Sequence, residues 1–147
     1  MKASQKAYDL IKESEALRLQ SYRDTGNILT IGYGHTFGVQ QGQIITEEIA
    51  NLYLLKDVTD CENELNALGL DLDQNQYDAC IDFIFNLGIA RFKSSTLLKK
   101  IRKNRNDITI KDEFAKWIYG RVNGKPVKLE DLVTRRYKET RLYFELI

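Results

Sequence analysis

The sequence has no long apolar run, no low-complexity tract, no internal repeat and no flexible linker. Its apolar stretches are short and its first fifteen residues alternate charged and apolar side chains, so we expect neither a transmembrane helix nor a signal peptide. An apolar fraction of 43% with 29% charged residues is typical of a globular protein and excludes a disordered chain. The 147 residues are expected to form one domain with a sizeable core.

Only two cysteines are present, Cys61 and Cys80, and neither belongs to a CxxC or Cys/His group. Both fall in stretches with helical periodicity. We therefore interpret them as buried thiols of a reducing compartment, in preference to a disulfide or a metal site.

Basic residues are unevenly distributed. Residues 1–70 contain six basic and ten acidic side chains, a net charge of −4, whereas residues 71–147 contain sixteen and eleven, a net charge of +5. All sixteen lie from Arg91 onward. A positive lobe favours attraction to a polyanionic surface, but a solvated face of helices is the better explanation of the charge pattern alone.

Capping residues and apolar periodicity predict an α+β, mainly helical fold class. Helices are expected at residues 4–15, 46–68, 73–87, 95–103, 109–119 and 129–146. Strands are expected at residues 17–22 and 28–33 around a turn at 24–27, with a third short strand at 42–45 and a loop at 120–126.

The helix at residues 46–68 is the longest expected element. At about 23 residues it would be roughly 34 Å long, enough to join two lobes across a groove. The single domain would then consist of a small antiparallel β lobe at residues 16–45, this connecting helix, and a helical lobe at 73–147 packed with the N-terminal helix.

Two helices are expected to supply the core of the helical lobe. Residues 79–87 are apolar nearly all round. The last helix is expected to turn an apolar stripe inward, made of Leu132, Val133, Tyr137, Thr140, Tyr143 and Phe144.

The segment from Glu15 to Thr36 carries two acids and a hydroxyl in three backbone settings. Glu15 ends the first helix, Asp24 lies in a turn before Gly26, and Thr30 opens a β-branched strand. In general, a carboxyl group among apolar neighbours keeps its proton, whereas one in an open turn is ionised. This division of roles is the one used to break a glycosidic bond. Taken alone, an acid at a helix end is usually a surface charge.

The same segment resembles a known family. Eight residues separate Glu15 from Asp24, five separate Asp24 from Thr30, and the segment ends in TIGYGHT. This spacing is similar to that of the phage lysozymes, glycoside hydrolase family twenty-four. Later family segments are matched in order by QYDACIDFIFNLG, FKSSTLLKKI and LVTRRYKETRLYF. Two departures are Ala16 and Asp131, which stand where the family usually has glycine. We interpret both as affecting local backbone fit more than activity.

The resemblance implies a catalytic role for three residues. Glu15 would be the general acid that protonates the leaving glycosidic oxygen. Asp24 would act on the opposite face of the sugar ring, either by stabilising oxocarbenium-like charge and activating water or by direct attack. Thr30 would orient the attacking water with Asp24. Glu13, the nearest competitor of Glu15, points about 160° to 200° away around the helix.

Further residues match family segments around the saccharide groove. Of the adjacent pair Arg135 and Arg136, the resemblance favours Arg135 as the residue that reaches across the groove to hold Glu15. The groove itself would be lined by Thr36, Phe85 and Thr96, although Phe85 is at least as well explained as a core residue.

His35 is the only histidine and is a candidate base. Because the family uses carboxylates for acid and base work, we favour a structural role for His35, paired with an acid on the connecting helix. The resemblance implies no metal and no organic cofactor.

The implied protein is a lysozyme-like endolysin with its active-site cleft between the two lobes. It would hydrolyse the β-1,4 bond between N-acetylmuramic acid and N-acetylglucosamine in peptidoglycan glycan strands, for host-cell lysis by a phage or prophage. We expect a monomer without nucleic acid and without stable membrane insertion. It would be made in the host cytoplasm and would need a separate pore protein to reach the cell wall.

Three other functions compete with this interpretation. A lytic transglycosylase uses the same acid but forms an anhydro sugar, and the presence of both Asp24 and Thr30 argues against it. A silent wall-binding module is disfavoured by the intact set of catalytic groups. A nucleic-acid-binding domain is suggested by the basic residues after Arg91, but no aromatic-interleaved basic ribbon is present.

Overall fold

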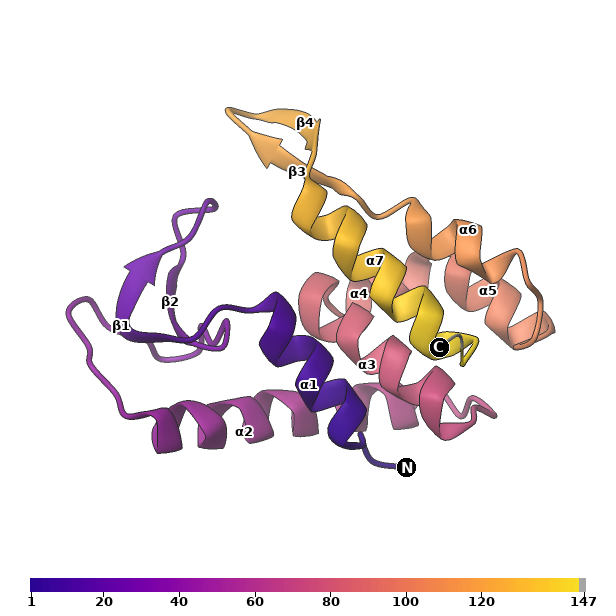
Figure 1. Ribbon diagram of the computed structural model, residues 1–147, viewed down its shortest axis with the longest axis horizontal. Helices are drawn as coiled ribbons and strands as arrows, with labels where there is room; N and C mark the ends of the chain where they lie inside the picture. Colours follow the sequence, from indigo (N-terminus) through magenta and orange to yellow (C-terminus); the bar gives the residue numbers. More distant parts are fainter. Residues whose placement is uncertain (146–147) are drawn as a thin grey trace.

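The computed structural model describes residues 1–145 (Figure 1). In this part of the chain the helices are α1 (Gln5–Ser14), α2 (Glu47–Asn66), α3 (Gln74–Leu87), α4 (Ile89–Ser94), α5 (Thr96–Lys103), α6 (Ile110–Ala115) and α7 (Glu130–Tyr143). The strands are β1 (Arg18–Arg23), β2 (Leu29–Gly32), β3 (Tyr119–Val122) and β4 (Lys125–Lys128). The predicted α+β, mainly helical class is confirmed.

Helix α2 connects the two halves of the molecule, as predicted for residues 46–68. It begins after Thr46, whose Oγ1 accepts a hydrogen bond from the Ile49 N–H at 3.2 Å. Its 20 residues span about 30 Å. One end packs against β2 and the other against α3, while α1 and α7 lie against α3 (Figure 1). None of the helices in residues 1–145 combines the length and apolarity that a membrane crossing requires.

Strands β1 and β2 form an antiparallel hairpin in which Tyr22 pairs with Thr30. The third strand predicted at residues 42–45 is wrong, because this segment makes only one isolated bridge, between Gln20 and Ile44. Gly42, at a φ of +77°, interrupts the extended backbone on one side, and Thr46 starts α2 on the other. The segment is therefore too short to continue the sheet.

The core of the helical half is built around α3. Phe83, fully buried, packs edge-to-face against the rings of Phe92, Phe114 and Trp117. This arrangement matches the prediction of an apolar centre at residues 79–87.

Cys61 and Cys80 are both buried and free, as predicted. Burial raises the pKa of Cys61 to about 12 and also raises that of Cys80. A thiol with so high a pKa forms little thiolate, so both cysteines serve as small packing residues.

The apolar stripe predicted for the last helix is confirmed only in part: Tyr143 is buried and Phe144 packs against the core, whereas Tyr137 is exposed. Tyr137 is 59% exposed, and the buried residues of α7 are Arg135, Arg136, Glu139 and Tyr143. Most of this face is polar because it packs on polar side chains of α3, to which both arginines are hydrogen-bonded. Leu146, in the predicted range, lies outside the described residues.

The predicted loop at residues 120–126 is a second hairpin, β3–β4, which projects beyond the start of α7 (Figure 1). Asn123 and Gly124, at φ of 52° and 78°, form its two-residue turn. An Asn-Gly pair is the strongest short sequence signal for such a turn. Helix α6 ends at Ala115 and β3 begins at Tyr119, so the helix predicted through residue 119 stops early.

The capping box of α3 provides a stability test. Asp73 Oδ1 accepts from the Gln76 N–H at 2.8 Å, and Gln76 Oε1 accepts from the Asp73 N–H at 3.1 Å. Asp73→Ala should lower the free energy of unfolding by about 1 kcal/mol, measured by urea denaturation. Asp60→Ala is the control, since Asp60 makes only an exposed helical ion pair with Lys56, worth about 0.3–0.5 kcal/mol. Equal losses in both variants would contradict the assignment of the cap.

Candidate functional site

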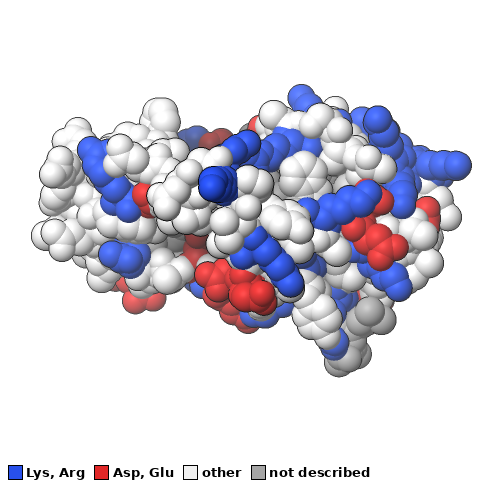
Figure 2. All heavy atoms as spheres, turned by 90° about the horizontal axis from the view of Figure 1, so that it is seen from above, with Lys and Arg blue, Asp and Glu red and all other residues white. Residues whose placement is uncertain are grey.

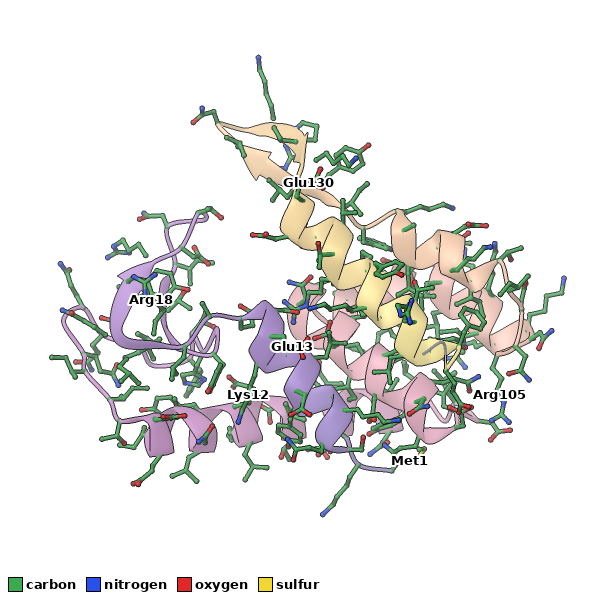
Figure 3. All side chains as sticks on the ribbon, in the orientation of Figure 1. Met1, Lys12, Glu13, Arg18, Arg105 and Glu130 are labelled. Atoms are coloured by element: carbon green, nitrogen blue, oxygen red, sulfur yellow. The ribbon has the colours of Figure 1, made fainter. Side chains whose placement is uncertain are left out.

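Glu15 lies where α1 ends and the chain turns toward β1. Its N–H still donates to Ile11 O at 2.8 Å, but its φ of −102° and ψ of 111° are extended. Figure 3 shows the two sides of this connection, with Glu13 on α1 and Arg18 on β1. The Glu15 side chain is 25% exposed, and its Oε1 is 2.7 Å from Nη1 of Arg135. Glu15 is thus a partly buried acid with a charged partner 120 residues away.

Glu13 has different surroundings. Its side chain is 59% exposed and forms an ion pair with Lys138, with Oε2 3.1 Å from Nζ. An exposed pair of this kind contributes little to stability. Of the two acids at the end of α1, only Glu15 is directed into the molecule.

Asp24 follows β1 and is fixed by the turn that joins β1 to β2. Its Oδ1 accepts hydrogen bonds from the N–H groups of Gly26 and Ile28, each at 2.9 Å. Such an Asx turn sets the side chain by its own backbone. Within residues 1–145 no hydrogen bond to Asp24 Oδ2 is found, so this oxygen is left for solvent or a ligand.

Thr30 lies in β2 and is 4% exposed. Its hydroxyl donates to Ile28 O at 2.9 Å, and since a hydroxyl has one proton, Oγ1 remains available as an acceptor. The same carbonyl also accepts from the Asp24 N–H at 3.0 Å. The backbone of Ile28 therefore fixes both Asp24 and Thr30, a role for which its side chain gives no sequence signal.

Gly34 lies against the carboxyl group of Glu15. It has a φ of +74°, and a Cβ at this position would be 3.2 Å from Glu15 Oε2 and 3.3 Å from Glu15 Cδ. Only glycine combines this backbone conformation with room for the carboxyl group. Glu15 is therefore in contact with the loop that continues from the strand of Thr30.

Arg135 connects Glu15 to a buried acid on α3. Its Nε and Nη2 donate to Asp82 Oδ2 and Oδ1, each at 2.9 Å, and its Nη1 donates to Glu15 Oε1 at 2.7 Å. Sequence reasoning did not identify Asp82, although an acid inside an otherwise apolar helical run is a visible signal of a buried ion pair.

Glu139 on α7 is fully buried beside Asp82. Burial, together with the negative charge of Asp82, raises the pKa of Glu139 well above its usual range. Burial alone would raise the pKa of Asp82 too, but the hydrogen bond from Glu139 and the charge of Arg135 outweigh it and lower the pKa. The two shifts have opposite directions, so Glu139 binds a proton more readily than Asp82 does, even though Arg136 Nε lies 2.7 Å from Glu139 Oε1.

Arg136 forms hydrogen bonds with a different set of residues. Its Nη2 donates to Asn86 Oδ1 at 2.7 Å and to Glu139 Oε2 at 3.0 Å, and its Nη1 donates to Trp117 O at 3.3 Å. Of the two adjacent arginines, it is Arg135 that contacts Glu15.

His35 is held on α2, as expected for a structural role. Its Nδ1 is 2.8 Å from Asp57 Oδ2 and its ring stacks on Tyr53 at 4.3 Å. Burial raises the pKa of Asp57, and the hydrogen bond to His35 offsets part of that effect. The pair fastens the loop after β2 to the connecting helix.

The three residues expected to line a groove differ in burial. Thr36 and Thr96 are exposed, whereas Phe85 is half-buried and packs against the core. Within residues 1–145 no hydrogen bond or ion pair joins any of the three to Glu15, Asp24 or Arg135. Figure 2 shows basic side chains gathered at the end of the molecule formed by α5 and α6, in line with the positive charge of residues 71–147.

Comparison with known proteins gives consistent matches over nearly the whole chain. The phage lysozyme family profile matches residues 12–139. An endolysin of Acyrthosiphon pisum secondary endosymbiont phage 1 is 41% identical, covering 97% of this chain and 98% of the relative. The chain spans only 55% of an endolysin of Bacillus phage PZA, which is 36% identical over 97% of this chain.

Solved structures with the same fold are also similar in sequence. An endolysin from Escherichia coli O157:H7 phage FAHEc1 superposes with a TM-score of 0.90 at 34% identity, covering 100% of this chain and 96% of that one. The muramidase domain of SpmX from Asticaccaulis excentricus superposes with a TM-score of 0.87 at 34% identity, with 97% of each chain covered.

The raised pKa of Glu139 predicts a pH dependence of stability. Between the unfolded value near 4.5 and the raised folded pKa, the folded state binds a proton that the unfolded state lacks. This contribution therefore grows as the pH falls through that window, by up to about 1.4 kcal/mol per pH unit. The pKa of Asp82 is lowered, so its contribution to the free energy of unfolding decreases as the pH falls. This opposite effect begins only below the usual aspartate pKa of 3.8.

Urea denaturation at about pH 7 and about pH 5 would measure the effect. Glu139→Gln lacks the titrating group, so the stability of the wild type relative to this variant should increase toward about pH 5. A constant or decreasing difference would show that Glu139 is ionised in the folded protein.

Proposed function

Because the chain belongs to the phage lysozyme family, we propose that it is a lysozyme that hydrolyses the β-1,4 bond between N-acetylmuramic acid and N-acetylglucosamine in bacterial peptidoglycan. Its biological role is that of an endolysin in host-cell lysis. The observation that carries this proposal is the setting of Glu15, a partly buried acid bound to Arg135 at 2.7 Å and in contact with the loop that follows Thr30. The whole chain, residues 1–147, acts as one lysozyme domain.

Glu15 acts as the general acid. It donates its proton to the glycosidic oxygen as the bond to the anomeric carbon breaks. Arg135 holds Oε1, so the carboxyl group is presented in one orientation. The absence of a side chain at Gly34 leaves room for Oε2, since a Cβ there would lie 3.2 Å from it.

Asp24 acts on the opposite face of the sugar ring. Its Oδ1 is occupied by two backbone N–H groups, which leaves Oδ2 to act. Oδ2 either stabilises the oxocarbenium-like charge and activates water, or attacks the anomeric carbon directly. The anomer of the product distinguishes the two, since the first route inverts the configuration and the second retains it.

Thr30 positions the attacking water. Because its hydroxyl proton is committed to Ile28 O, Oγ1 accepts a proton of the water while Asp24 accepts the other. A lytic transglycosylase has no use for such a site, since it excludes water from the reaction. The saccharide on either side of the cleaved bond is contacted by Thr36, Phe85 and Thr96.

The enzyme works as a monomer on glycan strands and needs no metal or organic cofactor. Synthesis takes place in the host cytoplasm, and a separate pore protein gives access to the wall. The basic end of the molecule (Figure 2) promotes encounter with the anionic wall through long-range attraction.

Glu15→Gln should abolish the release of muropeptides from purified peptidoglycan, because the amide cannot donate a catalytic proton. Glu13→Gln, the matched control two residues away, should keep most of the activity, since Glu13 makes only a surface ion pair. Mass spectrometry of the digest provides the measurement. Products ending in reducing N-acetylmuramic acid support a hydrolase, products lighter by one water a transglycosylase, and equal activity of both variants would exclude Glu15 as the acid.

Gly34→Ala should lower the rate of peptidoglycan hydrolysis about tenfold or more, because the added methyl group displaces the Glu15 carboxyl. Gly38→Ala is the control: Gly38 also has a positive φ, of +69°, but a Cβ there meets nothing within 4 Å. Both variants should lose about 1–2 kcal/mol of stability from backbone strain. If both were equally active, Gly34 would have only a conformational role.

A further inference from the structure

Arg135 divides its donors between two acids. Two parallel hydrogen bonds, both 2.9 Å, join its guanidinium to Asp82, and one of 2.7 Å joins it to Glu15. Parallel bonds fix both the position and the plane of a guanidinium. The orientation of Nη1 toward Glu15 is therefore set by Asp82.

Asp82 is buried at a position where a carboxylate needs a charged partner. Its side chain is 0% exposed and it lies in α3 beside fully buried apolar residues such as Ile81 and Phe83. A buried carboxylate is costly unless it is paired and hydrogen-bonded. Arg135 supplies that pairing through two hydrogen bonds of 2.9 Å.

We propose that Asp82 is a positioning residue for the reaction, acting through Arg135 to hold the Glu15 carboxyl group in its productive orientation. The inference rests on the proposed lysozyme function and extends it from Glu15 into the core between α3 and α7. Glu15 is on a chain segment that has left α1 and is 25% exposed, so it lacks a rigid element of its own. Arg135, at 4% exposure, transmits the rigidity of the core to it.

The arrangement also assigns different tasks to the adjacent arginines. Arg136 is bound to Asn86, Glu139 and the Trp117 carbonyl, so it fixes α7 to the rest of the helical half. Arg135 is held by α3 and keeps one nitrogen, Nη1, directed at Glu15. Substitution of Asp82 is therefore expected to affect turnover more than substrate binding.

The first experiment compares Asp82→Asn with the wild type on soluble uncrosslinked glycan strands. Asparagine presents one acceptor and one NH₂ donor, so it cannot accept both hydrogen bonds from Arg135. We expect kcat to fall about 10- to 100-fold with KM within about twofold, because orientation of the acid is lost while the groove is kept.

Glu113→Gln is the matched control. Glu113 is also a buried acid, at 4% exposure, and pairs with two cations, Lys100 and Lys116, but has no link to Glu15. Its loss should lower stability while leaving kcat close to that of the wild type. Assays at a temperature at which both variants remain folded separate the two effects. Equal kcat values for both variants would overturn the positioning role.

A double-mutant cycle tests whether Asp82 acts through Arg135. The effect of Asp82→Asn on kcat should disappear, or shrink to less than about twofold, in an Arg135→Lys background, because lysine cannot bridge the two acids in the same way. Effects that multiply fully in the double variant would show that Asp82 acts by another route, and would overturn the proposal.

An observation on a variant that leaves Asp82 intact avoids any dependence on its folding. In Glu15→Gln, the Nε–H proton of Arg135 should remain in slow exchange by NMR, since Asp82 alone holds that side of the guanidinium. Loss of the signal would mean that Glu15 holds Arg135, the reverse of the proposal. If the wild type released no sugar, the proposed function would fail, whereas the NMR result would still report on Asp82 and Arg135.

Discussion

Charged groups inside the interface between α3 and α7 constrain how these two helices pack. The ion pair of Arg135 with Asp82 joins α7 to α3, and the two side chains are only 5% and 0% exposed. Removing charges from water costs several kcal/mol per ion, and the cost is offset only when every donor and acceptor is matched. The two helices can therefore adopt one register and one separation, because a shift by an atomic radius leaves a buried charge unpaired. Apolar packing alone tolerates such shifts.

The two halves of the site are held in place by different kinds of contact. Asp24 and Thr30 are fixed by local contacts within the β1–β2 hairpin, mostly through the backbone of Ile28. Glu15 is fixed by contacts between distant segments, through α7 and α3. Helix α2 and the His35–Asp57 pair keep the hairpin in place relative to the helices. Helix α2 thus connects Asp24, which is fixed by contacts within its own hairpin, to Glu15, which is fixed by contacts with distant segments.

This contrast explains how much could be predicted from sequence. Capping signals at Thr46 and Asp73 located the helix starts because a cap depends on neighbours only a few residues away. The β3–β4 hairpin was missed although its Asn-Gly turn is a local signal. The buried polar face of α7 could not be predicted for another reason. Its burial depends on which side chains of α3 it contacts, whereas a prediction from apolar periodicity places every arginine on the exposed face. The roles of Glu15 and Arg135 are implied by the family resemblance. The roles of Asp82 and Gly34 depend on contacts with Arg135 and Glu15 that only the folded structure brings together.

The long separation between Glu15 and Arg135, 120 residues, has a consequence for the order of events during synthesis. A chain emerges from the ribosome N-terminus first, so the hairpin and the acid are present early, while the arginine that orients the acid arrives near the end. Partly made or prematurely terminated chains carry a complete β half and an unsupported Glu15. The contact between Arg135 and Glu15 can form only after α7 has been made. An unfinished chain therefore lacks the arginine that contacts Glu15 in the folded protein.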